Sequence, residues 1–263
     1  MTRWIELDGA VNVRDLGGLP TADGRAVQPG RLIRSADLQG LTDADVRMLV
    51  DDLGVRAVAD LRTGVEVRSE GPGPLHSVDD VEIVHLSLFP ETGERTDVAA
   101  DPDAPVVLPW QTDERTDVIA KRGAAAVYLG YLEQRGDSVL AALRLIAGSP
   151  GATIVHCAAG KDRTGTVVAI ALTEVGVTPE AIVEDYARSA EQIDAIFGRL
   201  LQSKTYNADL DGTDPQRHAP RAETMRNLLA TVQDEYGGFS AWLRTQGWTD
   251  EDAAALRRKL LDP

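Results

Sequence analysis

One stretch of the chain combines a nucleophile with groups suited to binding an anion. Residues 153–166 read TIVHCAAGKDRTGT and contain Cys157, the only cysteine among 263 residues, with Arg163 six positions later. A short apolar run precedes Cys157 and a longer one begins at Val167, which predicts a strand, a tight loop and a helix. A cysteine thiolate is a strong nucleophile, and the arginine fork matches two oxygens of a tetrahedral anion. The spacing therefore indicates attack by sulfur on an oxyanion bound in the loop.

The loop backbone is expected to bind the anion together with Arg163. Several N–H groups at the start of a helix lack intrahelical partners, and together with the helix dipole they favour negative charge. Gly160 permits backbone torsions that a side chain would forbid, and the small Ala158 and Ala159 leave room for the anion. Such a loop would stabilise a thiolate when empty and a phosphate when filled.

Four further residues around the cysteine have predicted roles. Asp162 is the nearest acid, and we expect it to protonate a leaving oxygen and then activate water against a cysteinyl-phosphate. Lys161 adds a cation that could bind a second phosphate or a carboxylate of the substrate. Thr164 is placed to donate a hydrogen bond toward the sulfur, and His156 to fix the loop through its ring nitrogens.

The remaining pattern predicts an α/β fold in a single domain, 1–263. Short apolar runs at 31–34, 55–61 and 81–86 predict strands, and helical spacing with caps separates them. We therefore expect a central, mostly parallel sheet flanked by helices. Asp60 and Arg62 follow one predicted strand and either orient the catalytic loop or serve the structure alone. Further helices are expected at about 42–53, 65–69, 124–132, 138–147, 179 onward, 193–201, 225–236, 239–246 and 249–261. Residues 87–118 lack periodicity and are read as a linker or a flap on the substrate side.

The charge and the cysteine content restrict the class of protein. With 42 acidic and 27 basic side chains the formal net charge is −15, which opposes binding to nucleic acid or to anionic membranes. The first residues lack the apolar core of a signal peptide, and no apolar run approaches about 20 residues. We expect a cytoplasmic protein without membrane insertion, although secretion without a cleaved signal stays open. One cysteine and four scattered histidines give no metal-ligand spacing, so neither a metal nor a cofactor is expected.

The motif at 156–165, HCAAGKDRTG, matches the Cys-x5-Arg-Thr/Ser signature of protein tyrosine phosphatases. Its ending resembles the bacterial branch of tyrosine and lipid phosphatases, as do NVRDLGG at 12–18, DLRT at 60–63 and the late Ala219-Pro220 with Met225. The resemblance implies a phosphatase fold with the loop aspartate as the acid. It also implies hydrolysis of phosphotyrosine in proteins, and in some relatives of phosphoserine, phosphothreonine and phosphoinositides. It further implies a helical lid, whose counterpart here would be about residues 190–236.

Three alternatives stay open at this level. Many tyrosine phosphatases take the acid from a separate upstream loop, and this sequence offers Asp97, Asp101, Asp103, Asp113, Asp117 and Asp137. A phosphate-binding module without turnover would need the same loop. An arsenate reductase also uses a cysteine in an anion loop, but it normally needs further cysteines, and this chain has none. The sequence gives no indication of the oligomeric state.

Overall fold

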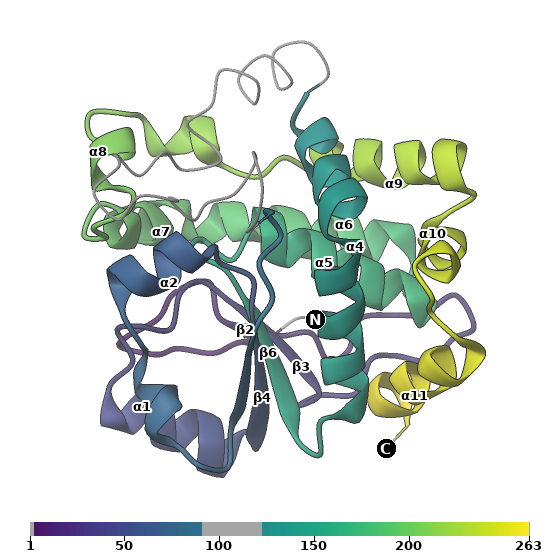
Figure 1. Ribbon diagram of the computed structural model, residues 1–263, viewed down its shortest axis with the longest axis horizontal. Helices are drawn as coiled ribbons and strands as arrows, with labels where there is room; N and C mark the ends of the chain where they lie inside the picture. Colours follow the sequence, from purple (N-terminus) through teal and green to yellow (C-terminus); the bar gives the residue numbers. More distant parts are fainter. Residues whose placement is uncertain (1–2, 91–122, 263) are drawn as a thin grey trace.

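Within the part of the chain that the structure describes, a six-stranded sheet organises the fold (Figure 1). The computed structural model describes residues 3–90 and 123–262. Four neighbouring strands are parallel, and the first two pair antiparallel at one edge, so the predicted mostly parallel sheet is confirmed. In spatial order the strands are β1 (Arg3–Trp4), β2 (Arg14–Asp15), β3 (Leu32–Ser35), β6 (Ala152–His156), β4 (Val55–Asp60) and β5 (Glu82–His85).

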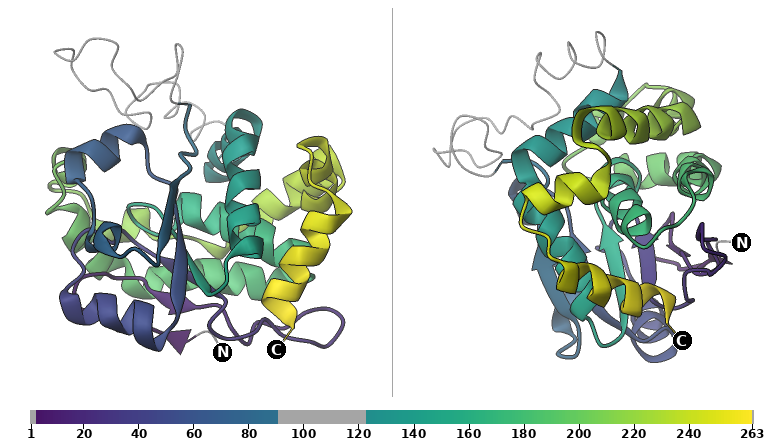
Figure 2. Two further views of the ribbon diagram at one scale, coloured as in Figure 1. Left: turned by 60° about the horizontal axis from the view of Figure 1, so that its bottom comes forward. Right: turned by 90° about the vertical axis from the view of Figure 1, so that its right-hand side faces the viewer.

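Helices cover both faces of the sheet. One face carries the shorter elements α1 (Asp43–Arg47), η1 (Met48–Asp52) and η2 (Pro74–Ser77), and α2 (Gly64–Glu70) follows β4. The other face carries the longer helices. In Figure 2, α11 lies alongside α4, and an ion pair between Arg144 and Asp252 joins them at 2.8 Å. The longer helices are α4 (Ala124–Gly148), α5 (Asp162–Glu174), α6 (Pro179–Arg188), α9 (Ala222–Tyr236), α10 (Phe239–Thr245) and α11 (Asp250–Leu261).

Two of the expected helices differ in detail. The predicted helix at 42–53 starts as expected, with Thr42 and Asp45 forming a reciprocal capping box, but it widens into the π-helical η1 after Arg47. The two helices expected around 124–147 form one element, α4, which is kinked at the non-helical Arg135. Gly54, with a φ of 65°, ends the first of these segments as its sequence predicts.

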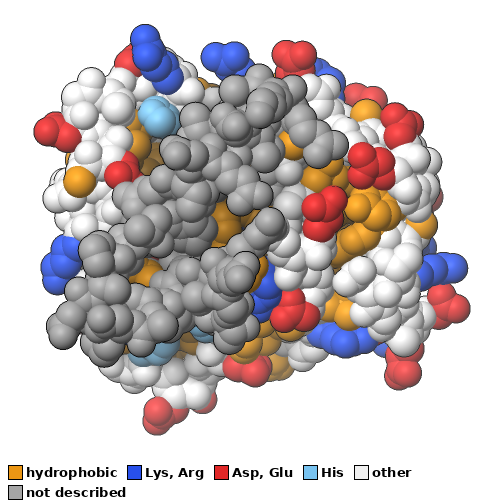
Figure 3. Space-filling model, turned by 45° about the horizontal axis from the view of Figure 1, so that its top comes forward, with side chains coloured by type: hydrophobic (Ala, Val, Ile, Leu, Met, Phe, Trp, Pro, Cys, Tyr) orange, Lys and Arg blue, Asp and Glu red, His pale blue; other side chains and the backbone are white. Residues whose placement is uncertain are grey.

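Charged side chains of both signs are interspersed on the described part of one face of the molecule. On the face shown in Figure 3, acidic and basic side chains lie near one another, and hydrophobic side chains are visible between them. The described acidic side chains visible in this view are therefore not gathered into one patch. Within the described residues, no helix is both long enough and apolar enough to cross a membrane.

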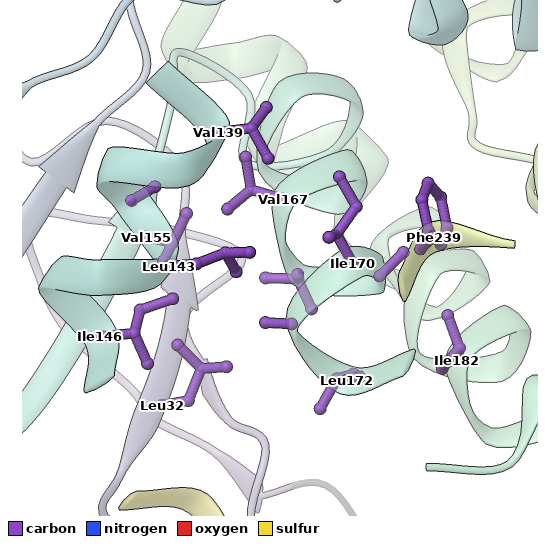
Figure 4. Packing of buried hydrophobic residues seen from close by; sticks show 14 of the residues in the cluster. Leu32, Val139, Leu143, Ile146, Val155, Val167, Ile170, Leu172, Ile182 and Phe239 are labelled. Atoms are coloured by element: carbon purple, nitrogen blue, oxygen red, sulfur yellow. The ribbon is translucent and has the colours of Figure 1, made fainter. Parts of the chain in front are cut away.

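Alternation along the strands separates two hydrophobic clusters. In β6, Val155 belongs to the larger cluster with α4 and α5, whereas the preceding Ile154 belongs to the smaller cluster beneath η1. Figure 4 shows Val155 of β6 and Leu32 of β3 packed against side chains of α4 and α5. Both clusters fix β6, so the loop that follows this strand starts from the most buried part of the molecule.

A third, small cluster lies over the loop after β6. It joins α7 (Ile193–Leu200) and α8 (Asn207–Leu210) to Ala158 and Ala159 of the loop. By contrast, α9 packs its buried residues into the large cluster. Of the segment 190–236 predicted as a lid, α9 therefore packs in the core, whereas the elements from α7 to η5 (Pro215–His218) do not belong to that cluster.

Part of the predicted linker or flap at 87–118 lies outside the described residues. The same holds for five of the six upstream aspartates: Asp97, Asp101, Asp103, Asp113 and Asp117. The sixth, Asp137, is described. Its exposed side chain pairs with Arg135 at 3.0 Å and does not line the cavity above Cys157.

Candidate active site

The central strand β6 ends at His156 and is followed by Cys157, the first residue of the loop. β6 lies between β3 and β4, and Cys157 is only 2% exposed. The helix α5 begins at Asp162, so five residues connect the strand to the helix through Lys161. The predicted order of strand, tight loop and helix is confirmed.

Neighbouring segments hold successive carbonyl groups of the loop. The N–H of Asp37 donates to the carbonyl of Ala158 at 3.0 Å. The Nδ2 of Asn12 donates to the carbonyls of Ala159 and Gly160 at 3.1 and 3.2 Å. Because a trans peptide directs its N–H opposite to its C=O, fixing these carbonyls turns the following N–H groups the other way. The loop therefore has the backbone arrangement expected of an anion site.

Gly160 has the torsion that only glycine adopts readily. Its φ is 66°, and an added Cβ would lie 2.3 Å from the carbonyl oxygen of Ser35. Arg34 Nη2 donates to the Gly160 carbonyl at 2.8 Å and locks this turn from below. The role predicted for Gly160 as a conformational requirement of the loop therefore has a steric basis.

A buried cluster of two arginines and one aspartate supports the loop. Asp185 of α6 pairs with Arg14 Nε at 2.8 Å and with Arg34 Nη1 at 2.5 Å. Burial alone would raise the pKa of Asp185, but the two guanidinium groups more than offset it and hold the pKa below its ordinary value. Burial and the nearby Arg34 lower the pKa of Arg14 to about 10, which leaves it charged at neutral pH.

The side chain of Arg163 is held by a carboxylate from α2. Its Nη1 and Nη2 atoms lie 2.6 and 2.8 Å from the two oxygens of Glu66. Glu66 also accepts from the N–H of Thr63 at 2.7 Å, in the capping box that starts α2. Burial alone would raise the pKa of Glu66, but the Arg163 charge more than offsets it and keeps the carboxyl ionised. Glu66 therefore orients the fork of Arg163.

A tyrosine near α8 also contacts this pair. Arg163 Nη2 donates to Tyr206 Oη at 3.0 Å, and Tyr206 donates to Glu66 at 2.5 Å. Burial and then the Glu66 charge raise the pKa of Tyr206, so the phenol stays protonated. A phosphate that takes this position on Nη2 must displace Tyr206.

Asp162 accepts hydrogen bonds on both carboxylate oxygens. The hydroxyl of Tyr128, from α4, donates to Oδ1, and Lys161 Nζ lies 2.8 Å from Oδ2. The hydroxyls of Tyr128 and Tyr186 are 2.8 Å apart. These contacts orient the carboxylate of Asp162, which lines the same cavity as Cys157.

A buried group behind the loop joins three of the predicted supporting residues. Asp60 lies opposite His156 in the register of β4 and β6, and its Oδ1 is 3.6 Å from His156 Nε2. Arg62 Nη2 binds Asp60 at 2.6 Å. Burial alone would raise the pKa of Asp60, but the charge and the hydrogen bonds of Arg62 hold it below the ordinary value. Burial lowers the pKa of His156, which keeps the ring neutral. Asp60 and Arg62 thus lie behind the loop, in contact with it through His156.

The hydroxyl of Thr164 does not make the predicted bond to sulfur in this structure. Thr164 is fully buried, and its Oγ1 has no hydrogen-bond partner among the described residues. A buried hydroxyl without a hydrogen-bond partner costs free energy. A thiolate that formed on Cys157 would be stabilised by accepting a hydrogen bond from it. The suggested donation to the thiolate stays a prediction.

A cavity of about 550 Å³ opens above Cys157. Its polar lining comprises Cys157, Lys161, Asp162 and Arg163 from the loop side, together with Tyr206, Asp209 and His218. The opposite wall is apolar and comes mainly from α7 and α8, with Phe89 and Tyr131 from the other side: Ile193, Ile196, Phe197, Leu200 and Leu210. A substrate whose charged group binds at the loop would therefore place an apolar part of its structure along this wall.

Three residues of the site are not predicted by the sequence. Glu66, Tyr128 and Tyr206 lie 97, 34 and 43 positions from the loop residues they bind. Only Glu66 has a local signal, the Thr63-x-x-Glu66 capping pattern, and that signal indicates a helix start and not a partner for Arg163.

The fold and the loop define a class, the enzymes that bind a tetrahedral oxyanion in a cysteine loop between a parallel strand and a helix. The model of the tyrosine phosphatase family matches residues 5–262. The chain is 31% identical to the triple specificity protein phosphatase PtpB of Mycobacterium tuberculosis over 97% of this chain and 98% of that protein. It is 29% identical to a tyrosine-protein phosphatase of Nostoc commune, over 92% of this chain and 78% of that one. The chain belongs to the tyrosine phosphatase family.

Proposed function

We propose that this phosphatase hydrolyses phosphate monoesters through a cysteinyl-phosphate on Cys157. The observation that supports it most is the meeting of Cys157, Arg163 and Asp162 around one cavity, on a loop whose carbonyls are held outward. The N–H groups from Ala158 to Thr164, with Arg163, would bind the three terminal oxygens of the phosphate. No metal is part of this mechanism.

In the first step, the sulfur of Cys157 attacks phosphorus and the bond to the leaving oxygen breaks. Asp162 in its acid form donates its proton to that oxygen. Arg163 neutralises charge on the transferring group while Glu66 keeps its fork oriented.

In the second step, a water attacks phosphorus and the sulfur–phosphorus bond breaks. Asp162, now a carboxylate, accepts the proton of that water, and the sulfur leaves as a thiolate. Thr164 is the proposed donor to this thiolate, since its hydroxyl is buried beside the loop without a partner among the described residues. His156 serves by fixing the loop, with Asp60 and Arg62 behind it.

Protein phosphotyrosine is the first substrate class we propose, with phosphoserine, phosphothreonine and phosphoinositides as further classes. PtpB is named a triple specificity phosphatase, and the apolar wall opposite the loop suits the aryl group of a phosphotyrosine. Lys161 would bind a second phosphate or a substrate carboxylate once it leaves Asp162.

The wider assignments are proposals of the same kind. We propose one phosphatase domain over 1–263, with the elements from α7 to η5 as a lid. A cytoplasmic site of action and the lack of nucleic-acid binding rest on the single cysteine and the net charge of −15, and stay predictions.

Turnover of an aryl phosphate tests the proposal. The wild-type chain should release phosphate, and Cys157→Ser should lose essentially all of that activity while still folding. Asp162→Asn should lose about 10²–10⁴-fold in turnover and keep phosphate binding, and a chelator should change nothing. Binding without turnover would favour a phosphate-binding module, and turnover of arsenate would favour a reductase. An unchanged rate in Asp162→Asn would move the acid to an upstream aspartate.

A further inference from the structure

A chain of two tyrosine hydroxyls ends on the carboxylate of Asp162. Tyr128 of α4 donates its hydroxyl proton to Oδ1 of Asp162, and its oxygen lies 2.8 Å from that of Tyr186 in α6. A tyrosine has one proton to donate. Since Tyr128 gives its proton to the carboxylate, Tyr186 must donate to Tyr128. The chain therefore has a fixed direction, from Tyr186 to Tyr128 to Asp162.

Both tyrosines are buried and stay protonated. Tyr128 is 3% exposed and Tyr186 is 2% exposed. Burial and then the Asp162 charge raise the pKa of each phenol above its ordinary value. Hydrogen bonds in a row polarise one another where water is excluded, so Tyr186 strengthens the donation by Tyr128.

The two oxygens of Asp162 have partners of different kinds. Oδ1 faces the buried hydroxyl of Tyr128, whereas Oδ2 pairs with Lys161 Nζ at 2.8 Å on the cavity side. Lys161 and Asp162 side chains keep 16% and 28% of their surface exposed, so their contact can be exchanged for another partner. A dianionic phosphate in the loop competes for Lys161, but it cannot replace Tyr128.

We propose that Tyr128, supported by Tyr186, is a positioning residue that holds Oδ1 of Asp162 and leaves Oδ2 to carry the catalytic proton. The inference rests on the function proposed above, in which Asp162 is the acid and then the base. In the first step the proton on Oδ2 passes to the leaving oxygen as the oxygen–phosphorus bond breaks. In the second step Oδ2 takes a proton from the attacking water as the sulfur–phosphorus bond breaks.

Other ionisable groups line the same cavity as Asp162 or lie near its carboxylate. They come from the loop, from α4 and α6, and from the elements over the cavity: Cys157, Lys161, Arg163, Tyr128, Tyr131, Tyr186, Asp209 and His218. All but one remain in a variant that lacks only the Tyr128 hydroxyl. A comparison with the wild type therefore isolates the contribution of that hydroxyl.

The test is the pH dependence of kcat/KM on phenyl phosphate, whose poor leaving group needs the acid. The fall of kcat/KM at high pH reports loss of the proton from Asp162. Tyr128→Phe keeps the ring stacked on Tyr131 and removes a donor that favours the ionised carboxylate. The midpoint of this fall should move up by about one pH unit. Tyr186→Phe should move it in the same direction by less, and Tyr236→Phe, a remote tyrosine of α9, should leave it in place.

Asp162→Asn separates the possible failures. In that background the fall at high pH should vanish, and adding Tyr128→Phe should change nothing more. If the fall in kcat/KM depends on Asp162 but its midpoint is the same in the wild type, Tyr128→Phe and Tyr186→Phe, the hydroxyl chain alone is overturned. A shift of that midpoint to lower pH would overturn it as well. Lack of turnover in the wild type, or full activity in Cys157→Ser, would instead overturn the proposed function. If Tyr128→Phe does not fold, the profile of Tyr186→Phe decides.

Discussion

At the scale of single residues, the site depends on a carboxylate that does no chemistry itself. Glu66 holds both terminal nitrogens of Arg163 and starts its own helix through the capping box with Thr63. One side chain thus couples the start of α2 to the geometry of the anion site. A planar fork tolerates little rotation before it loses two oxygens of a phosphate.

Glu66→Gln should therefore lower kcat/KM on an aryl phosphate by about 10- to 100-fold, because an amide cannot bind both nitrogens as an acceptor. Glu66→Ala should also destabilise the fold by roughly 3 kcal/mol, since it leaves the buried charge of Arg163 without its main partner. Steady-state kinetics and urea unfolding measure the two effects. The exposed Glu82→Gln serves as the control, and equal kinetics in Glu66→Gln and wild type would contradict this role.

At the scale of elements, the proposed lid from α7 to η5 contacts the loop and α2 through a small set of residues. α7 and α8 meet the loop through the third cluster, which includes Ala158 and Phe197. Beyond α7, Ser203 Oγ and the N–H and Oγ1 of Thr205 all donate to Glu70 of α2, at 2.6, 3.0 and 2.7 Å. In Figure 1, α7 and α8 lie beside α2 at one end of the molecule. A segment with few buried contacts opens at lower cost than the core.

Glu70→Ala should loosen this segment without unfolding the protein. It removes one acceptor that serves three donors, a loss of about 1 kcal/mol, which corresponds to about fivefold in an opening equilibrium. The rate of alkylation of Cys157 by iodoacetamide should rise by about that factor, because the thiol is only 2% exposed in the closed form. Glu180→Ala on α6 provides the matched exposed change. An alkylation rate equal to that of the wild type would show that this contact does not restrict access.

The elements themselves follow closely from local sequence, and the site only in part. The strand before Cys157, the start of α6 at Thr178 and the turn at Gly160 have signals within a few residues. The π-helical η1 was not predicted, because packing of Leu49 and Val50 against the sheet overrides the regular spacing. The sequence also could not show that α9 packs in the core while α7 lies over the loop. The apolar residues of 225–236 have the same helical spacing whether the helix packs on the core or covers the cavity.

The partners of Arg163 and Asp162 could not be predicted for a different reason. Glu66, Tyr128 and Tyr206 are brought to the loop only by the order of the strands and the docking of α4 and α8. Each also has a plausible local role, as a helix cap or as part of an apolar face. Nothing in the chain around them distinguishes that role from a contact across the fold.

At the scale of the whole molecule, buried carboxylates link stability to pH. Asp60, Glu66 and Asp185 are all buried beside arginines, and each has a pKa held below its ordinary value. Each contributes stability that is present above the pKa of the unfolded chain, about 4, and is lost as the pH falls through the lower pKa of the folded chain. The three act in the same direction.

The free energy of unfolding should therefore stay nearly constant from pH 8 to 5 and fall below about pH 4. Asp185→Asn should be destabilised by about 3–5 kcal/mol at pH 7, because two buried arginines lose their shared partner. Its stability should also fall less steeply with acid than that of the wild type. Urea unfolding at several pH values measures both, with the exposed Asp51→Asn as the control. Equal stability of the wild type at pH 7 and 3.5 would contradict the linkage.

The place of β6 in the sheet also sets an order for assembly during synthesis. β3, β4 and β5 are complete by residue 85, yet β6 at 152–156 is the strand that fills the gap between β3 and β4. Until the ribosome has added those residues, β3 and β4 each present an unpaired edge, which is the part of a sheet most prone to wrong pairing. The strand that carries the nucleophile closes the sheet, so a chain truncated before residue 152 lacks both the active site and the centre of its fold.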